Sequence, residues 1–261
     1  MTAIEAAVLG LIQGLTEFLP VSSSGHLVIG QTLFGLAGSQ LAFDVLVHGA
    51  TLLAVLVYFR GRLIDLVKPA GWTYVLKLAL ATVPVVIVAP VVYPWVRVAF
   101  TEPALVAGFL AVTGALLLSL YLRPEDDRPG SSVLEPGWWT ALVIGVFQTC
   151  ALLPGISRSG TTIVAGIWLG LAPRAAAEFS FLLAIPAILG AIIYESKSLR
   201  TAAASGMADT FAIGSVVAFV SAIAAIGLVF RLVDRRRFRW LGFYCLVAAG
   251  LFGAWLASRS A

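Results

Sequence analysis

Charged residues are scarce in this sequence. Only 11% of its 261 residues are Asp, Glu, Lys or Arg, whereas 60% are hydrophobic and the mean hydropathy is +1.00. Because a soluble domain of this length carries about a quarter charged residues, the composition excludes a water-soluble protein. The hydrophobic runs are continuous and about 20 residues long, without the polar and apolar alternation typical of barrel strands. An all-α protein that crosses a membrane several times is therefore expected.

Cysteine is rare too, since the sequence contains two, Cys150 and Cys245. Both lie in apolar segments, where we expect them to pack rather than form a disulfide. The net charge of +4 comes mainly from arginines between the hydrophobic runs, so a nucleic-acid partner is not expected.

Eight hydrophobic regions divide into two kinds. Six are uninterrupted and predict full membrane spans at 41–59, 75–96, 104–122, 178–195, 211–233 and 240–257. The other two, 3–36 and 138–172, are interrupted near their middle by "LPVSSSGH" and "LPGISRSGTT". Their halves are too short to cross comfortably, which predicts two re-entrant hairpins whose tips are buried in protein or line a wet cavity.

The distribution of Lys and Arg supports this topology. If neither hairpin crosses, twelve of these residues lie on one side and four on the other, with Arg158 set apart in a tip. The positive-inside rule places the richer side in the cytoplasm and both termini outside. If only one hairpin crossed the membrane, every loop after it would lie on the opposite side, and the difference in the number of Lys and Arg residues would shrink.

An internal repeat appears when residue 10 is laid over residue 145. The matching pairs are Gly10 and Gly145, Gln13 and Gln148, Ser22 and Ser157, Ser24 and Ser159, Gly25 and Gly160, and, after one residue of slippage, Phe43 and Phe179, and Tyr58 and Tyr194. We expect one domain over 1–261, with a first repeat at about 1–122 and a second at about 138–257. Each repeat holds a hairpin and three spans, and because three is odd the second repeat should be inverted, with the tips meeting near the bilayer midplane.

The first tip contains seven candidate site residues. Gln13 and Glu17 are four residues apart, so they share one face of a helix. A carboxylate among apolar neighbours in a membrane indicates function, although a snorkelling or capping role is the alternative. Three serines and a glycine can cap a helix or present it to an anion, and the histidine is either catalytic or a satisfied core residue. These five are Ser22, Ser23, Ser24, Gly25 and His26.

The second tip is centred on Arg158. An arginine at membrane depth is costly, and its guanidinium suits bidentate binding of phosphate oxygens. A structural ion pair with Glu17 is the alternative. Hydroxyl and backbone donors surround it at Ser157, Ser159, Gly160, Thr161 and Thr162. The roles of Asp44, His48 and Glu178 stay open, and Glu178 is placed either near the site or at the cytoplasmic rim.

Together the tips predict an intramembrane site for an oxyanion. A carboxylate can hold Mg²⁺ or Ca²⁺ together with substrate phosphates, and Arg158 can stabilise charge on a transferring phosphoryl group. A hydroxyl or an imidazole could attack phosphorus, or a general base could activate water. The spacing indicates this kind of site without fixing one reaction.

The motifs "QGLTEFLPVSSSGH" and "PGISRSGTT", in this order, closely resemble those of the undecaprenyl-diphosphate phosphatase family, also called bacitracin-resistance proteins. The resemblance continues through "FDVLVHGATLLAVLVYF" and "EFSFLLAIPAILGA" and covers nearly the whole chain. It implies hydrolysis of undecaprenyl diphosphate to the monophosphate carrier of cell-wall synthesis, dependent on Mg²⁺ or Ca²⁺. It also implies two interlocked inverted repeats in the bacterial inner membrane, with a site that opens to the periplasm.

Residue by residue, the resemblance implies that Gln13 and Glu17 hold the metal. It makes Ser23 and His26 catalytic, and Arg158 the phosphate-binding arginine, with Ser157, Ser159 and Thr162 as supporting donors. The family allows either Glu or Gln at position 13, and Gln13 is the uncharged one of the two. The sequence "HGAT" departs from the more usual His-x-Gly-Thr and leaves the role of His48 open. The nucleophile is either Ser23 or His26.

A flippase for the lipid carrier or an anion transporter is the alternative function, since inverted repeats with broken helices are also transporter architecture. Neither role obviously requires the serines, Glu17 and His26 together. A purely structural scaffold would have no use for an intramembrane Arg and Glu. The prenyl chain length and the oligomeric state, including a homodimer, stay open.

Overall fold

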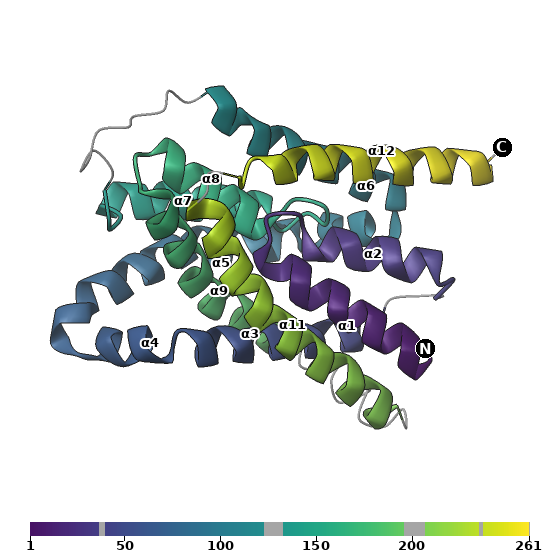
Figure 1. The fold of residues 1–261 in the computed structure, drawn as a ribbon, viewed down its shortest axis with the longest axis horizontal. Coiled ribbons are helices and arrows are strands. Elements are labelled where there is room, and N and C mark those ends of the chain that lie inside the picture. The colour runs from purple at the N-terminus through teal and green to yellow at the C-terminus, as the bar shows by residue number, and fades with distance from the viewer. Residues whose placement is uncertain (37–39, 123–132, 196–206, 235–236, 261) are drawn as a thin grey trace.

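The computed structural model describes residues 1–36, 40–122, 133–195, 207–234 and 237–260 (Figure 1). Helices account for nearly all of the regular structure there, and the one extended pairing described is a bridge between Val133 and Leu171. In chain order the elements are α1 (Ala3–Phe18), α2 (Ser23–Leu33), α3 (Leu41–Tyr58), α4 (Arg60–Val67), η1 (Pro69–Gly71), α5 (Trp72–Thr101), α6 (Pro103–Leu118), η2 (Ser119–Leu122), α7 (Trp138–Cys150), α8 (Arg158–Trp168), α9 (Pro173–Tyr194), α11 (Ala208–Asp234) and α12 (Trp240–Ser260).

The six predicted spans are confirmed as helices long and apolar enough to cross a membrane. They are Leu41–Tyr58, Pro69–Thr101, Pro103–Leu122, Pro173–Tyr194, Ala208–Val233 and Trp240–Arg259. The prediction of 75–96 was too short at both ends, because the helix begins at Trp72 and continues to Thr101. Large apolar side chains on α5 point outward, as lipid-facing residues should, with Val86, Ile87 and Val91 more than 60% exposed.

The two interrupted regions form helical hairpins. Their arms hold 16 and 11 residues in α1 and α2, and 13 and 11 in α7 and α8, all short of the roughly 20 needed to span a bilayer. Helix α1 ends at Phe18 because Leu19 precedes a proline and takes an extended conformation. In the second hairpin the turn contains Gly155 at φ 103°, a conformation that favours glycine.

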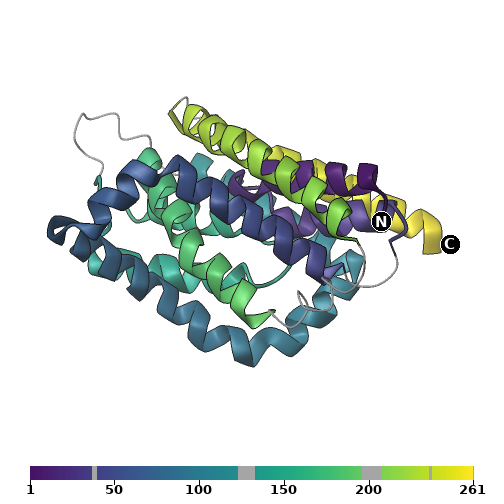
Figure 2. The ribbon, with the colours of Figure 1, turned by 90° about the horizontal axis from the view of Figure 1, so that it is seen from below.

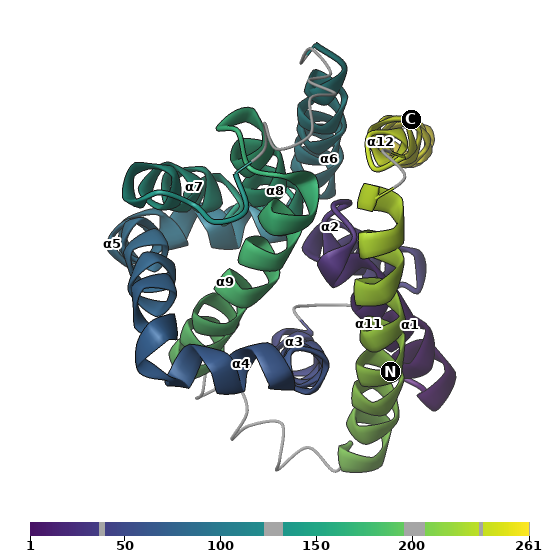
Figure 3. The same ribbon diagram turned by 60° about the vertical axis from the view of Figure 1, so that its left-hand side comes forward.

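Close backbone approaches join each hairpin to a long helix. A Cβ atom at Gly10 of α1 would lie 2.2 Å from the carbonyl oxygen of Gly214 in α11, and one at Gly145 of α7 would lie 2.3 Å from that of Ala81 in α5. Small residues permit such packing of helices in membranes. The pairing of α1 with α11 is visible in Figures 1 and 2, and that of α7 with α5 in Figure 3.

The first and last elements of the two predicted repeats also pack in matched fashion. Gly10 and Gly145, which the repeat aligns, make the contacts just described, and α6 approaches α12 through reciprocal contacts of Gly114 and Gly242. Helix α12 lies beside α6 in Figures 1 and 3. The inverted orientation of the second repeat stays a prediction, and so does the organisation of the chain as one domain made of two repeats.

An aromatic cluster fixes the centre of the helix bundle. The Phe181 ring of α9 lies 5.3 Å from the Phe18 ring at the end of α1 and 5.7 Å from the Phe230 ring of α11. Phe59, which follows α3, contacts both Phe181 and Phe230. These ring contacts, three of which are edge-to-face, hold the C-terminal end of α1, and with it the first tip, against both halves of the chain.

The position of α4 bears on the membrane topology. The two termini lie towards one end, whereas α4, which carries Arg60 and Arg62, lies at the other (Figures 1 and 2). This arrangement agrees with the separation of charge along the sequence. Which of the two ends faces the cytoplasm stays a prediction.

Candidate active site

The two hairpin tips meet inside the helix bundle. A Cβ atom at Gly25, in the first turn of α2, would lie 3.0 Å from the Cα of Gly155 in the opposite tip. A hydrogen bond of 3.2 Å runs from the Ser159 hydroxyl of α8 to the Leu19 carbonyl oxygen of the first tip. The predicted meeting of the two motifs is therefore present, and side chains larger than glycine at position 25 would separate them.

Each inner helix begins at a serine that caps it. The Ser22 hydroxyl accepts a 3.2 Å bond from the Gly25 amide, and the Ser157 hydroxyl accepts a 3.0 Å bond from the Gly160 amide. Ser22 has φ 68°, the one positive φ of a non-glycine residue among those described. Such strain persists only where the surrounding structure enforces it, and it is typical of functional sites.

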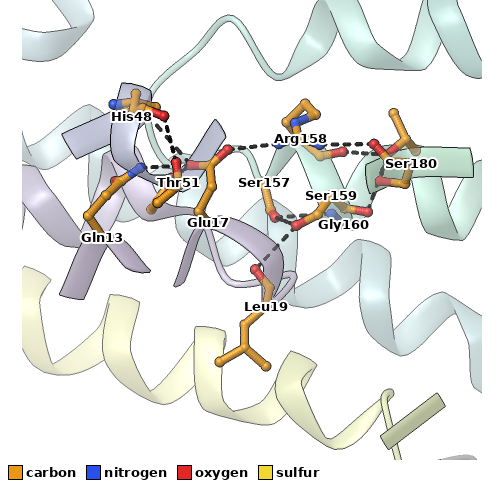
Figure 4. A network of polar contacts seen from close by, with 12 residues as sticks. Gln13, Glu17, Leu19, His48, Thr51, Ser157, Arg158, Ser159, Gly160 and Ser180 are labelled. Atoms are coloured by element: carbon orange, nitrogen blue, oxygen red, sulfur yellow. Dashed lines mark hydrogen bonds and ion pairs between the residues drawn. The ribbon is translucent and has the colours of Figure 1, made fainter. Parts of the chain in front are cut away.

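Glu17 lies at the centre of the polar contacts between the tips (Figure 4), and its side chain is 6% exposed. Its Oε1 accepts a 2.7 Å bond from Arg158 Nη2. Its Oε2 accepts bonds from the Ser23 hydroxyl at 2.6 Å and from Gln13 Nε2 at 3.1 Å. His48 Nε2 lies 3.6 Å from the same oxygen. One buried carboxylate thus joins residues of four helices, α1, α2, α3 and α8, and both motifs.

Arg158 is held at its other end by α9. Its Nη1 donates a 3.1 Å bond to the Ser180 carbonyl oxygen, and the Ser180 hydroxyl lies 2.7 Å from that of Thr162. The ion pair with Glu17, considered as a structural alternative, is therefore present. A guanidinium carries five N–H donors, and the two bonds described use two of them. The pair neutralises both buried charges and leaves Arg158 able to bind an oxyanion.

His26 has its hydrogen-bond partners outside this network. Its Nδ1 lies 2.8 Å from the Ser22 carbonyl oxygen, and its Nε2 lies 2.8 Å from the Tyr244 hydroxyl of α12. The structure therefore brings Ser23 and Arg158 into direct contact with Glu17, and joins His26 to α12 through Tyr244.

The remaining predicted donors of the tips have partners within the protein. The Thr161 and Thr162 hydroxyls each donate to the Arg158 carbonyl oxygen, at 2.9 and 2.8 Å. The Ser24 hydroxyl lies 3.4 Å from that of Ser22, and the Ser159 hydroxyl lies 3.2 Å from that of Ser157. These contacts shape the tips, and a role for any of these residues in phosphate binding stays a prediction.

The predicted metal ligands adjoin each other and have suitable chemistry. Gln13 is fully buried, and its Oε1 has no hydrogen-bond partner among the described residues. A buried amide oxygen without a partner is unfavourable, and amide and carboxylate oxygens are the ligands that Mg²⁺ and Ca²⁺ prefer. Gln13 and Glu17 therefore fit a divalent cation, although no group of three or more His, Cys, Asp or Glu suited to a metal occurs in the described part of the chain.

Three residues outside the two tip motifs contact residues of the candidate site. Sequence reasoning missed Thr113 of α6, whose hydroxyl donates to the Gly155 carbonyl and accepts from the Ser157 amide, and it missed Ser180 and Tyr244. Thr113 and Tyr244 have no local sequence signal, because each is a single polar residue in an apolar run. Ser180 lies in "EFSFLLAIPAILGA", two residues after Glu178, but nothing in that stretch singles it out. Glu178, left open, binds Arg62 of α4 at 2.9 Å and belongs to a separate ionic cluster. Of the two other open residues, His48 reaches Glu17, and Asp44 accepts from Gln31 at 2.7 Å.

The sequence relatives of this chain agree with these motifs. The family model of the bacitracin resistance protein BacA matches residues 6–251. Proteins named undecaprenyl-diphosphatase from Desulfosudis oleivorans and Salinibacter ruber are 41% and 37% identical to this chain, with 99% and 98% of it covered and 100% of each relative. One of the same name from Syntrophotalea carbinolica is 40% identical over 97% of this chain and 99% of its own length. The chain thus belongs to the BacA family of bacitracin resistance proteins.

Proposed function

We propose that this protein is a phosphatase of the bacterial inner membrane that hydrolyses undecaprenyl diphosphate to undecaprenyl phosphate and inorganic phosphate. The names of its full-length relatives support this substrate. The bond between the Ser23 hydroxyl and Glu17 Oε2, beside Arg158, is the structural observation that carries it. A hydroxyl paired with a base next to an arginine is suited to phosphoryl transfer, whereas anion transport has no need of the hydroxyl–carboxylate pair.

Ser23 is the nucleophile in this proposal. Its hydroxyl oxygen attacks the terminal phosphorus while its proton passes to Glu17 Oε2, 2.6 Å away. The bond from that phosphorus to the bridging oxygen breaks, and undecaprenyl phosphate leaves. Water then hydrolyses the phosphoserine, which returns the proton from Glu17 to Ser23. His26 is the less suitable nucleophile, because its contacts direct Nε2 towards α12.

Arg158 binds the transferring phosphoryl group. The Ser180 carbonyl oxygen holds the guanidinium from one side and Glu17 from the other, so the charge is in place before substrate arrives. Preorganised charge of this kind stabilises the negative charge that develops on phosphoryl oxygens, and losing one such donor typically slows a reaction by about 10²–10³-fold.

Gln13 and Glu17 would hold Mg²⁺ or Ca²⁺. When bound, the cation would neutralise charge on the diphosphate oxygens. The end that carries α4 is the expected cytoplasmic end, and in this proposal the site opens to the opposite, periplasmic face. The prenyl chain would lie in lipid between helices, and the recycled monophosphate would serve peptidoglycan synthesis.

The proposal is tested with the purified protein in detergent. Undecaprenyl diphosphate is supplied, and inorganic phosphate and the lipid product are quantified with and without EDTA. We expect one undecaprenyl phosphate per phosphate released and loss of turnover on chelation. Binding of the lipid without any phosphate release, in the presence of either cation, would instead support a transporter.

A further inference from the structure

The last helix of the chain reaches the first hairpin through Tyr244 and His26, which are 218 residues apart in sequence. The Tyr244 hydroxyl lies 2.8 Å from His26 Nε2, and the two rings are nearly parallel, with an angle of 9° and centroids 5.6 Å apart. Tyr244 is 47% exposed and stands in an otherwise apolar stretch of α12. A phenol in such surroundings needs a hydrogen-bond partner, and here the partner is a residue of the active-site motif.

The contacts of His26 determine where its proton lies. A backbone carbonyl oxygen can only accept, so Nδ1, 2.8 Å from the Ser22 carbonyl, must carry the hydrogen. In the neutral ring Nε2 is then unprotonated, and it accepts the hydrogen of the Tyr244 hydroxyl. His26 is thereby held in the tautomer whose lone pair is available at Nε2.

We propose that Tyr244 is a positioning residue of the phosphatase site, which keeps His26 Nε2 unprotonated and oriented to accept a proton. The inference rests on the proposed function and assigns His26 to the second step. The phenol sets the tautomer and the orientation of the ring before this step, and the Ser22 carbonyl holds Nδ1–H throughout it. Once the phosphoserine has formed, water takes the place of the phenol at Nε2 and attacks the phosphorus bound to Ser23, and its proton passes to Nε2. The bond between phosphorus and the Ser23 oxygen breaks, this oxygen takes back the proton from Glu17, and His26 releases its proton to water.

The matched variants are Tyr244→Phe and Tyr58→Phe. The first removes the hydroxyl and keeps the ring, and the second removes a hydroxyl from a ring at the end of α3 that packs on Phe59 and Phe230. We expect Tyr244→Phe to lower kcat about tenfold, the equivalent of one hydrogen bond, with KM within about twofold. Tyr58→Phe should keep both constants within about twofold. An unchanged kcat in Tyr244→Phe, or a raised KM alone, would overturn the proposal.

A second measurement separates positioning from simple packing. The chain has two histidines, so ¹⁵N-histidine NMR of the full protein, with His48→Gln for assignment, reads the tautomer of His26 without any turnover. We expect the Nδ1–H form in the parent and a mixture of tautomers in Tyr244→Phe. An Nε2–H form in the parent would refute the inference even in an active enzyme. Conversely, if the parent protein had no phosphatase activity, the proposed function would be refuted, and the NMR spectrum would still report the contact between Tyr244 and His26.

Discussion

Arg158 Nη2 and Glu17 Oε1 lie 2.7 Å apart, although the two residues are separated by 141 positions in the sequence. The side chains are 15% and 6% exposed. Each charge makes the other tolerable at membrane depth, because a buried charge without a partner is strongly unfavourable. The pair also fixes the two hairpin tips against each other, so the same contact that stabilises the fold assembles the site.

Removing the arginine should therefore affect both stability and activity. We expect Arg158→Met to lower the free energy of unfolding by about 3–5 kcal/mol, because Glu17 stays buried without its cation. Adding Glu17→Gln should restore most of this stability, since no unpaired charge remains, while phosphate release stays at background. Thermal unfolding in detergent and phosphate release measure the two effects. Activity in the double variant would contradict the assignment of both residues.

The Ser23 hydroxyl should be essential to the reaction and nearly irrelevant to folding. We expect Ser23→Ala to reduce kcat by at least about 10³-fold, because no oxygen remains to attack phosphorus. Ser221→Ala is the matched control, since the Ser221 hydroxyl bonds to the Val217 carbonyl of its own helix. A Ser23→Ala enzyme with more than a tenth of the parent kcat would transfer the role of nucleophile to another group.

The residue at position 13 should set the affinity for the divalent cation. Gln13→Glu adds a second carboxylate next to Glu17, so we expect a lower cation concentration for half-maximal activity, whereas Gln13→Leu should raise it. Mn²⁺ titration followed by electron paramagnetic resonance reads the binding directly, without turnover. Identical cation affinities in the three proteins would remove Gln13 from the metal site.

Close packing of α1 on α11 should not tolerate a methyl group. Because a Cβ at Gly10 would lie 2.2 Å from the Gly214 carbonyl oxygen, we expect Gly10→Ala to destabilise the protein by about 1–3 kcal/mol. Gly250→Ala in α12 is the control, since a Cβ there meets nothing within 4 Å. The two variants are compared by their unfolding midpoints in detergent. Equal midpoints would show that α1 and α11 accommodate the added methyl group without loss of stability.

Glu178 should contribute little to catalysis. Its carboxylate binds Arg62, which also lies 3.7 Å from Glu135, in a partly exposed cluster that includes residues of α4 and α9. We expect Glu178→Gln to change stability by at most about 1 kcal/mol, with the difference shrinking in high salt. A large loss of kcat at unchanged stability would show that this cluster acts on the site.

The sequence predicted the membrane class, the six spans and the two hairpins because each depends on local composition. Hydrophobic length separates spans from hairpin arms, and "LPVSSSGH" and "LPGISRSGTT" contain the proline and glycine that end a helix. The proximity of Glu17 and Arg158 could be anticipated as well, because two rare buried charges of opposite sign favour each other.

Contacts that depend on one residue of a distant helix could not be predicted. Tyr244 and Thr113 are ordinary residues of apolar helices, and only the packing of α12 and α6 brings their hydroxyls to the tips. The direction of His26 is a further example, because its place in the motif says nothing about which nitrogen faces α12. Such details depend on tertiary packing rather than on local pattern.

The most direct measurement is the rate of phosphate release from undecaprenyl diphosphate by the parent protein and by Glu17→Gln, with Glu178→Gln as a matched carboxylate-to-amide control. Both variants are first checked for folding by their unfolding midpoints. We expect Glu17→Gln to be slower than the parent by at least about 10²-fold, and Glu178→Gln to remain within about threefold of it. A folded Glu17→Gln protein that releases phosphate at the parent rate would contradict the site described here.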